Sequence, residues 1–337
     1  MSIDIAPSIA PLVGEALGER ANAVRAEVGK AFIGQAEALD QVLIALLAGG
    51  HALIEGVPGL GKTLLVRALS QALGCAHARV QFTPDLMPSD VSGHAVYDPK
   101  SESFKIRRGP VFTNLLLADE INRAPAKVQS ALLEVMQEHQ VTIGRETFSV
   151  PDPFLVMATQ NPIESEGTYP LPEAQVDRFM MKVVVSYPTA PEEHAVVERA
   201  LQPAPITQAL LTPEDLVRMR ADVRQVYVDP AIVDYAVRLV TATRAPATVG
   251  LGELEKYVTY GASPRASIAL VLGGRALAFL RGREYVLPTD LRELTPDVLR
   301  HRIVLSYEAL ADDVDPDTVV AGVLRAVPVP EVALQDR

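Results

Sequence analysis

Short apolar runs alternate with segments of helical spacing through the first half of the chain. Between the runs, amphipathic patterns predict helices at residues 36–47, 64–73 and 125–139. This alternation predicts an α/β fold, in which a parallel sheet is covered by helices on both faces and the ligand site lies at the C-terminal ends of the strands. Five runs have the length and apolar content of core strands, at residues 51–55, 78–82, 111–118, 154–159 and 180–186.

Two segments depart from this alternation and predict hairpins. Residues 85–108 contain two short β-like runs around the turn sequence Asp98-Pro99-Lys100-Ser101, within a connection that is otherwise helix-rich. Residues 140–150 alternate apolar and polar side chains around Gly144-Arg145. We therefore expect two hairpins inserted into the α/β domain.

Beyond residue 188 the strand signals end and helical patterns recur. A chain of 337 residues is long enough for two domains. We predict a leader over residues 1–20, an α/β domain over 21–188 and an all-helical domain over 189–337. The helices of that last domain are expected at residues 192–201, 213–225, 230–244, 264–281 and 288–294.

Composition and charge narrow the class of protein. Nucleic-acid binding as the main activity is disfavoured, because the net charge is -11, aromatic residues make up 5% and tryptophan is absent. No apolar run reaches membrane-spanning length, and the N-terminus does not resemble a secretion signal. A single cysteine, Cys75, and six histidines without ligand spacing argue against a zinc site in this chain. We expect a protein of the cytoplasm that does not insert into a membrane.

The clearest motif follows the first predicted strand. Residues 56–63 read GVPGLGKT, which fits the phosphate-binding pattern G-x-x-x-x-G-K-[ST] between a strand and a helix. Glycines let backbone N–H groups turn toward a phosphate, Lys62 adds a positive charge, and Thr63 offers an oxygen to Mg²⁺. The alternative is a glycine-rich turn before a surface helix, which the strand–loop–helix context disfavours. The predicted nucleotide contacts are Gly56, Pro58, Gly59, Leu60, Gly61, Lys62, Thr63 and Leu64.

Two acidic residues end the third predicted strand. Asp119 suits Mg²⁺, and Glu120 suits a general base or a group that orients the attacking water, which are the groups that phosphoryl transfer to water requires. Two acids in a surface turn are the alternative. Asn161 ends the neighbouring strand, where its amide could reach the same phosphate, although Asn-Pro also forms simple turns.

Two arginines complete the set of candidates. Arg178 precedes the last predicted strand and could serve a neighbouring subunit, but most surface arginines are merely solvated. Ser263-Pro264 is a favourable helix start, and Arg265 falls in the first turn of that helix. A cation there opposes the helix dipole unless an anion is bound, and a triphosphate would be such an anion.

Together, five segments resemble the MoxR family of AAA+ ATPases. The resemblance covers residues 20–315 and implies a P-loop AAA+ core with an all-α lid. It also implies that residues 85–108 are the helix-2 insert and residues 140–150 the pre-sensor-1 insert of this clade. The segments are residues 56–63, LLLADEINRAPAKVQSALLEVMQEHQVTIG at 115–144, ATQNPIE at 158–164, GTYPLPEAQVDRF at 167–179 and YGASPRA at 260–266.

The resemblance implies a role for each candidate residue. Lys62 and Thr63 match the nucleotide and Mg²⁺ contacts, and Asp119 and Glu120 match the Walker B pair, with Asp119 also at the metal. Residues 32–35, with Gly34 and Gln35, match the segment near adenine. Asn161 matches sensor 1, Arg178 the arginine finger that acts on a neighbouring subunit, and Arg265 the sensor 2 arginine.

For function, the resemblance implies an ATP- and Mg²⁺-dependent ATPase that forms a ring, often a hexamer. MoxR-like proteins act as chaperones that mature or activate partner complexes, often with a protein carrying a von Willebrand factor A domain. Two other classes stay open from the residues themselves: a nucleotide-gated binding module with slow hydrolysis, and a nucleic-acid translocase. A small-molecule kinase is the least favoured class.

Overall fold

The computed structural model describes residues 14–57, 59–161, 167–203 and 205–331, and the side chains from residue 19 onward. Most of the predicted leader and Pro58 lie outside the described residues. The first helix, α1 (Gly14–Gly29), begins within the segment predicted as leader. No helix in the described part of the chain is both long and apolar enough to span a membrane.

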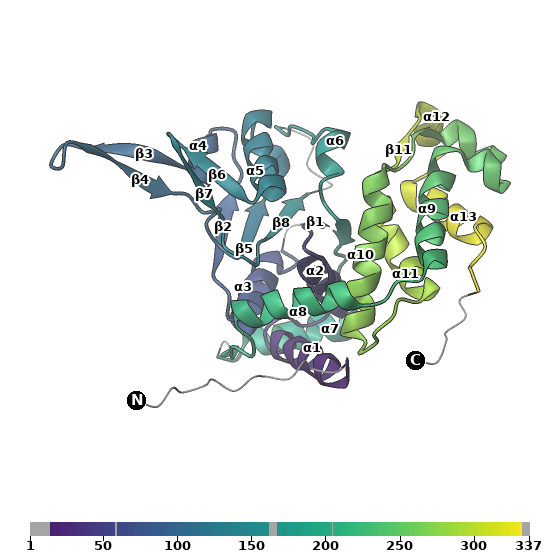
Figure 1. Cartoon of the computed structure of the whole chain (residues 1–337), viewed down its shortest axis with the longest axis horizontal. Helices are drawn as coiled ribbons and strands as arrows, with labels where there is room; N and C mark the ends of the chain where they lie inside the picture. Colours follow the sequence, from purple (N-terminus) through teal and green to yellow (C-terminus); the bar gives the residue numbers. More distant parts are fainter. Residues whose placement is uncertain (1–13, 58, 162–166, 204, 332–337) are drawn as a thin grey trace, which may run out of the picture.

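A five-stranded sheet forms the centre of the molecule (Figure 1). Its strand order is β2-β5-β8-β1-β9, and each neighbouring pair is parallel, as predicted. β5 starts at Leu115 rather than at residue 111, because the Asn114 side chain bridges two loops, accepting from the N–H of Ala76 and donating to the carbonyl of Pro153. The strands are β1 (Ala52–Glu55), β2 (His77–Gln81), β5 (Leu115–Asp119), β8 (Leu155–Gln160) and β9 (Met181–Val184).

Alternating side chains of the strands pack into two separate hydrophobic clusters, as a period of two requires. Ala52 and Ile54 of β1 belong to the cluster shared with α1, α2 (Ala36–Ala48) and α3 (Lys62–Ala72). Leu53, between them, belongs to the cluster on the other face with α5 (Ala126–Glu138). Three shorter elements connect the core strands, namely α4 (Pro88–Ser92), the 3-10 turn η1 (Ile121–Arg123) and α6 (Glu173–Val176).

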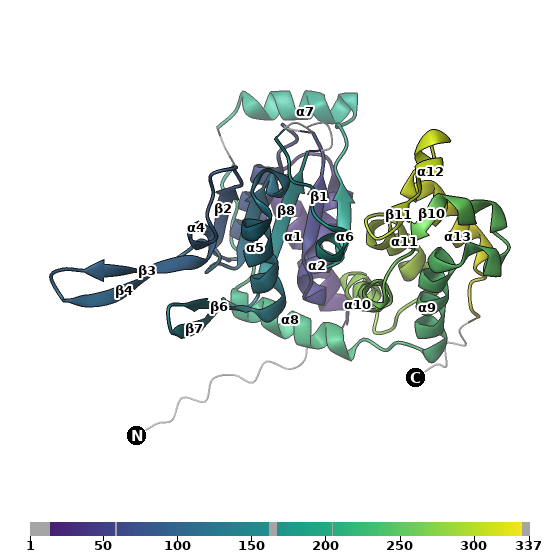
Figure 2. The ribbon, with the colours of Figure 1, turned by 90° about the horizontal axis from the view of Figure 1, so that it is seen from above.

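Hairpins form at both of the predicted places. β3 (Gly93–Asp98) pairs antiparallel with β4 (Ser103–Arg108), and this hairpin projects from the body of the molecule (Figures 1 and 2). Tyr97 lies opposite Phe104 in the ladder, and their rings meet edge to face at 5.4 Å between centroids. β6 (Gln140–Ile143) and β7 (Glu146–Ser149) form the second hairpin, directly after α5.

The chain after residue 188 is mainly helical, which confirms the predicted helical lid. Sequence reasoning missed α12 and α13, ended α11 too early, and missed a two-stranded antiparallel pair, so the lid is not purely helical. The pair is too short to leave an alternating pattern. The elements are α7 (Ala190–Ala200), α8 (Pro213–Gln225), α9 (Pro230–Arg244), η2 (Pro246–Val249), η3 (Gly252–Tyr257), β10 (Val258–Tyr260), α10 (Pro264–Leu280), α11 (Pro288–Leu299), β11 (Val304–Leu305), α12 (Tyr307–Ala311) and α13 (Pro316–Ala326).

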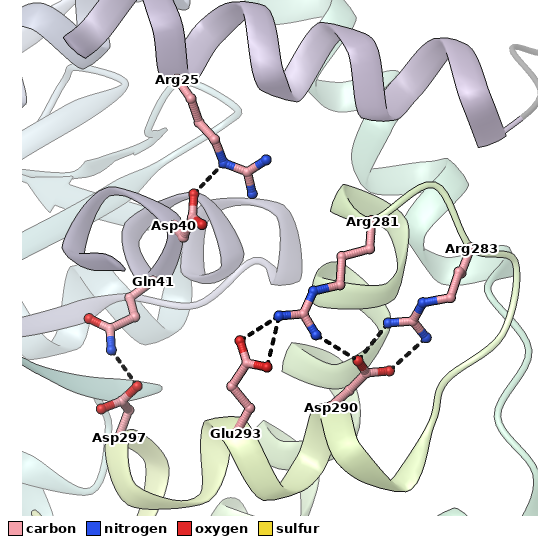
Figure 3. Close-up of polar contacts among 8 residues, drawn as sticks. All are labelled: Arg25, Asp40, Gln41, Arg281, Arg283, Asp290, Glu293 and Asp297. Carbon is pink, nitrogen blue, oxygen red and sulfur yellow. Dashed lines mark hydrogen bonds and ion pairs between the residues drawn. The ribbon is translucent and has the colours of Figure 1, made fainter. Parts of the chain in front are cut away.

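Ion pairs hold the lid helices to one another (Figure 3). Asp290, at the start of α11, accepts from both Arg281 and Arg283, and Glu293 accepts from Arg281. Three acidic residues near the C-terminus also bind within the lid. Asp315 caps α13 by accepting from the N–H of Thr318, Asp317 pairs with Arg300, and Asp312 accepts from the hydroxyl of Tyr257.

A buried guanidinium ties the lid to the start of β9. The side chain of Arg302 is 2% exposed and donates to the carbonyls of Phe179 and Met180 and to the carboxylate of Asp177. Asp177 also accepts from the Ser263 hydroxyl at the start of α10, at 2.8 Å. A second polar contact joins core and lid, because the side chain of Gln41 on α2 donates to the carboxylate of Asp297 on α11 (Figure 3). The lid is therefore fixed at the N-terminal end of the sheet.

Close backbone packing completes this junction between core and lid. A Cβ at Gly273 of α10 would lie 3.0 Å from Leu294 and 3.1 Å from Met180. A Cβ at Gly50 would lie 2.6 Å from the Cβ of Met180. Glycine at these two positions lets α10 and the start of β1 approach Met180, so that core and lid share one hydrophobic cluster.

His51 lies just before β1 and is buried between α5 and β8. Its Nε2 donates to the carbonyl of Met136 at 3.0 Å, and its Nδ1 accepts from the N–H of Val156 at 3.0 Å. Both ring nitrogens are therefore used in the neutral form, and protonation would break the second bond. Burial lowers the pKa of His51 to about 4.

We predict that His51 makes the fold sensitive to acid. Its pKa is lower in the folded than in the unfolded chain, so the stability it contributes is complete above pH 6.5 and is lost as the pH falls toward 4. Between pH 7 and 4.5 the loss amounts to about 2–3 kcal/mol. Urea unfolding of the wild type and of His51→Gln at both pH values measures it, because the gap between the two proteins shrinks at pH 4.5. A gap independent of pH would contradict the assignment.

Candidate functional site

The glycine-rich loop joins the C-terminal end of β1 to the start of α3. Gly59 and Gly61 have φ angles of 89° and 76°, a left-handed conformation that favours glycine. Gly61 is the N-cap of α3, and its carbonyl accepts from the N–H of Leu65 at 2.9 Å. Thr63 and Leu64, in the first turn of α3, are exposed. The loop therefore presents a helix N-terminus to solvent at this end of the sheet, the geometry that binds phosphate.

Lys62 lies over this loop. Its ammonium donates to the carbonyl of Gly56 at 2.6 Å. Burial lowers the pKa of Lys62, and the nearby carboxylates of Asp119 and Glu120 oppose that shift. The cation and the two acids predicted from the sequence are thus neighbours across the ends of β1 and β5.

Thr159 organises the two acids. Its hydroxyl donates to Oδ1 of Asp119 at 2.6 Å and accepts from the N–H of Glu120 at 2.8 Å. Thr159 is fully buried at the end of β8, next to β5. Glu120 has a φ of 55°, an uncommon left-handed conformation for a non-glycine residue, and its bond to Thr159 holds it there.

Side chains from β2 and from the turn after β5 each bind one carboxylate oxygen of Asp119 or Glu120. Arg79 donates to Oδ2 of Asp119 at 2.6 Å, and Gln81 donates to Oε2 of Glu120 at 2.7 Å. Arg123 pairs with the same oxygen of Glu120 at 3.1 Å. Sequence reasoning missed Thr159, Arg79 and Gln81, although each lies at or near the end of a strand adjacent to β5, where polar residues follow or interrupt an apolar run.

Asn161 follows β8 and is buried. The N–H of Gly56 donates to the carbonyl of Gln160 at 3.4 Å, so the glycine-rich loop starts beside Asn161. The structure thus brings together the residues of the loop, the two acids and Asn161 at one end of the sheet.

The segment before α2 lines the other side of the loop. The ring of Phe32 lies against Gly61, where a Cβ would be 3.3 Å from Cε2. Gly34 and Gln35 both have left-handed backbones, and Nε2 of Gln35 donates to the carbonyl of Ser186. Oε1 of Gln35 is buried and has no hydrogen-bond partner in the described part of the chain.

These features fit a nucleotide with its magnesium ion. The buried acceptor on Gln35 suits an amino group such as that of adenine, and the loop suits phosphates. The Thr63 hydroxyl and the Asp119 carboxylate are oxygen donors of the kind that Mg²⁺ binds. No three His, Cys, Asp or Glu side chains gather as a metal site among the described residues. Magnesium here would therefore depend on phosphate oxygens as well.

Arg178 and Arg265 lie elsewhere. Both line a cavity of about 270 Å³ with Gly49, Gly50 and Met180, which precede β1 and β9. Arg178 is exposed after α6 and donates to Gln137 of α5, and Arg265 is exposed in the first turn of α10. As predicted, the Ser263 hydroxyl caps this helix by accepting from the N–H of Arg265. The two arginines are together, but at the opposite end of the sheet from the glycine-rich loop.

Known proteins share this architecture. The family described as "ATPase family associated with various cellular activities (AAA)" matches residues 51–181, and the AAA lid domain matches residues 253–323. A crystal structure from Cytophaga hutchinsonii has a TM-score of 0.89 and 45% identity, covering 94% of this chain and 97% of that one.

Relatives in sequence point to one branch of that family. "Chaperone MoxR1" of Mycobacterium tuberculosis is 51% identical over 306 residues, which are 91% of this chain and 81% of that protein. "Protein MoxR" of Paracoccus denitrificans is 35% identical over 321 residues, covering 88% of this chain and 93% of that one. The chain therefore belongs to the MoxR family of AAA ATPases.

Proposed function

We propose that this ATPase forms a ring and hydrolyses ATP with Mg²⁺ at sites that are shared between neighbouring copies of the chain. Its substrates in this proposal are proteins and not nucleic acids. The observation that carries the proposal is the separation of the glycine-rich loop from Arg178 and Arg265 within one chain. A relative named as a chaperone supports the remodelling, maturation or activation of partner complexes. A partner with a von Willebrand factor A domain, a hexameric ring and a cytoplasmic location are part of the proposal on the family resemblance.

In the proposed mechanism, one copy supplies the residues that bind the phosphates and activate the water. Lys62 leaves the carbonyl of Gly56 and turns to the β- and γ-phosphates, while the loop N–H groups bind the phosphate oxygens. Mg²⁺, held by Thr63 and Asp119, would neutralise charge that develops on those oxygens. Glu120 accepts the proton of the attacking water, and Asn161 orients that water or the γ-phosphate.

The other half of the site comes from a neighbouring copy. The glycine-rich loop follows the C-terminal end of β1, whereas the two arginines lie beyond its N-terminal end. β1 has four residues, which span about 13 Å. An arginine side chain is too short to reach along the whole strand to a phosphate bound by the loop of its own chain. Arg178 and Arg265 of one copy therefore face the γ-phosphate of the next copy. Arg265, which the sequence predicted as sensor 2 without assigning it to a subunit, becomes a second group acting between copies.

One observation favours a slower, regulatory activity as a second candidate. Arg79 occupies Oδ2 of Asp119, and Gln81 and Arg123 occupy Oε2 of Glu120. With these contacts in place, both acids are engaged before nucleotide arrives. A nucleotide-gated binding module would keep such contacts for most of its cycle, whereas a remodelling motor would release them with its client. Steady-state ATPase with and without a partner protein separates the two, because only the motor is stimulated.

Glu120→Gln tests the water-activating group. The amide cannot accept the proton, so we expect ATP binding to be retained and turnover to fall by about 10²–10⁴-fold. Binding of a fluorescent ATP analogue and phosphate release measure the two properties. Normal turnover in this variant would show that another group activates the water.

Mixing two inactive variants tests the shared site. Lys62→Ala has no working loop, and Arg265→Ala lacks one lid arginine; each alone should be inactive. In rings mixed in equal amounts, a site works when the intact loop of an Arg265→Ala copy faces the intact arginine of a Lys62→Ala neighbour. About one site in four has this arrangement, so activity should recover to about a quarter of wild type. By itself, Arg178→Ala should reduce turnover by about 10³–10⁵-fold. Mixed with Lys62→Ala, it should recover activity in the same way as Arg265→Ala. A mixture that stays inactive with Arg265→Ala would place that arginine at its own loop.

Thr159→Val tests the group that positions both acids. Valine keeps the buried shape but removes the hydroxyl that joins Asp119 to the N–H of Glu120. We expect turnover to fall by about 10–100-fold and the Mg²⁺ concentration for half-maximal activity to rise. Thr159→Ser keeps the hydroxyl and should restore both values. Equal loss in the serine and valine variants would indicate a packing role instead.

A further inference from the structure

Arg178 is held at both ends of its side chain. Its backbone follows Asp177, whose carboxylate binds the buried guanidinium of Arg302. At the other end, Nη1 of Arg178 donates to Oε1 of Gln137 and, more weakly at 3.5 Å, to the carbonyl of Leu133, both on α5. Because Asp177 fixes the start of the side chain and α5 fixes its tip, the guanidinium has a defined position although it is exposed.

Both of these hydrogen bonds use the same nitrogen of Arg178. In the described part of the chain, its Nε and Nη2 have no hydrogen-bond partner. A guanidinium carries its N–H donors in a rigid planar fork that matches two oxygens of a phosphate. The side chain is therefore held along one edge, and the donors on the other edge can bind a phosphate at two points. The contact with α5 orients this group without using the donors that a ligand needs.

The groups that hold the Arg178 side chain are uncharged. Arg178 and Gln137 line a cavity of about 310 Å³, together with Ser130, Leu133, Glu134, Glu138 and Gln175. Two carboxylates thus line the same cavity, yet among the described residues neither forms an ion pair with Arg178. An ion pair would bind the guanidinium more tightly but would cancel much of its charge. An amide oxygen fixes the position and leaves the charge for a phosphate in the transition state.

We propose that Gln137 is the positioning residue for Arg178: its amide oxygen holds the guanidinium, with its charge intact, in the orientation that meets the γ-phosphate bound by the next copy. The proposal rests on the shared ATPase site proposed above and adds the group that prepares its arginine half. A free arginine side chain loses much rotamer freedom when it binds a ligand. Because Gln137 fixes the side chain in advance, less of that freedom is lost in the transition state and turnover is faster.

Helix α5 is a rigid support for this contact. It has 13 residues, and its buried side chains pack into one of the two hydrophobic clusters of the sheet. Gln137 lies in its last turn on the exposed side, where the partial negative charge of a helix C-terminus favours a nearby cation. A separate hydrogen bond joins α5 to α6, since Nε2 of Gln175 donates to the hydroxyl of Ser130 at 3.3 Å. The helix that carries Gln137 and the segment that carries Arg178 therefore stay together without the contact between these two residues.

Restraint is the alternative role for this contact. A restraining group would bind the donors that face the ligand, and its removal would raise turnover. Gln137 binds one nitrogen of Arg178 and leaves Nε and Nη2 for a ligand, so the geometry favours positioning. The two roles predict opposite signs for the effect of removing the amide, and experiment can separate them.

Two substitutions of Gln137 separate position from charge. Gln137→Met keeps the length of the side chain and removes the acceptor, so turnover should fall by about tenfold. Gln137→Glu keeps an acceptor but converts the contact into an ion pair, so turnover should fall further, by about 10²-fold. Steady-state phosphate release measures both. Gln175→Met is the matched control and should turn over at the wild-type rate, because it removes an amide from the same cavity without breaking a bond of the Arg178 side chain.

Mixing with Lys62→Ala shows at which site Gln137 acts. A Gln137→Glu copy has an intact loop, and a Lys62→Ala copy has an intact arginine half. In rings mixed in equal amounts, about one site in four pairs the two, so activity should recover to about a quarter of wild type. A structural defect of α5 would instead damage the loop of its own copy, and mixing would restore nothing. Gln137 is exposed, so the thermal unfolding of each variant and its binding of a fluorescent ATP analogue should match the wild type.

The outcomes separate this proposal from the shared site. A loss in both variants that is larger for glutamate, with recovery on mixing, supports positioning by a neutral amide. Turnover of Gln137→Met at or above the wild-type value overturns it, and so does a smaller loss for glutamate than for methionine. If Arg178→Ala recovers on mixing with Lys62→Ala but Gln137→Glu does not, Gln137 acts on its own loop, and the positioning role is wrong while the shared site stands. If neither recovers, the shared site fails and the positioning role fails with it.

Discussion

The buried guanidinium of Arg302 is the interaction on which the arrangement of this molecule depends. Burying a cation is unfavourable unless it is paired and fully hydrogen-bonded, and here Asp177 and the carbonyls of Phe179 and Met180 supply those partners. Asp177 in turn accepts from Ser263. One carboxylate thus fixes the start of α10 and the residue that precedes Arg178. Both arginines of the proposed shared site are placed by this single junction.

Much of the nucleotide-binding half was predictable from the sequence, because its determinants are local. The five strands follow from apolar runs, and the loop follows from the G-x-x-x-x-G-K-[ST] pattern between a strand and a helix, in which Gly59 and Gly61 have left-handed backbones. Asp119, Glu120 and Asn161 end adjacent parallel strands, which bring their C-terminal ends to one edge. Each of these residues directly follows or ends a strand in the sequence, so its place at this edge of the sheet could be predicted from the sequence.

The rest depends on packing between distant segments. Thr159 is 40 residues from Asp119 and reads as the end of an apolar strand, so its role appears only once β8 lies beside β5. The location of Arg265 depends on Arg302 and Asp177, which are 125 residues apart. The β10–β11 pair is likewise stabilised by long-range pairing, and strands this short carry no periodic signal. The capping of α10, in contrast, is local and was predicted correctly.

The placement of the loop and the arginines at opposite ends of the sheet has a consequence for counting working sites. In a shared-site assembly, every copy offers one nucleotide half and one arginine half. An open linear assembly always leaves the nucleotide half of one terminal copy without an arginine half beside it, whereas a closed ring pairs every nucleotide half with an arginine half. The activity per copy would then increase with the length of the assembly and reach its full value on closure, so that incomplete assemblies are intrinsically less active.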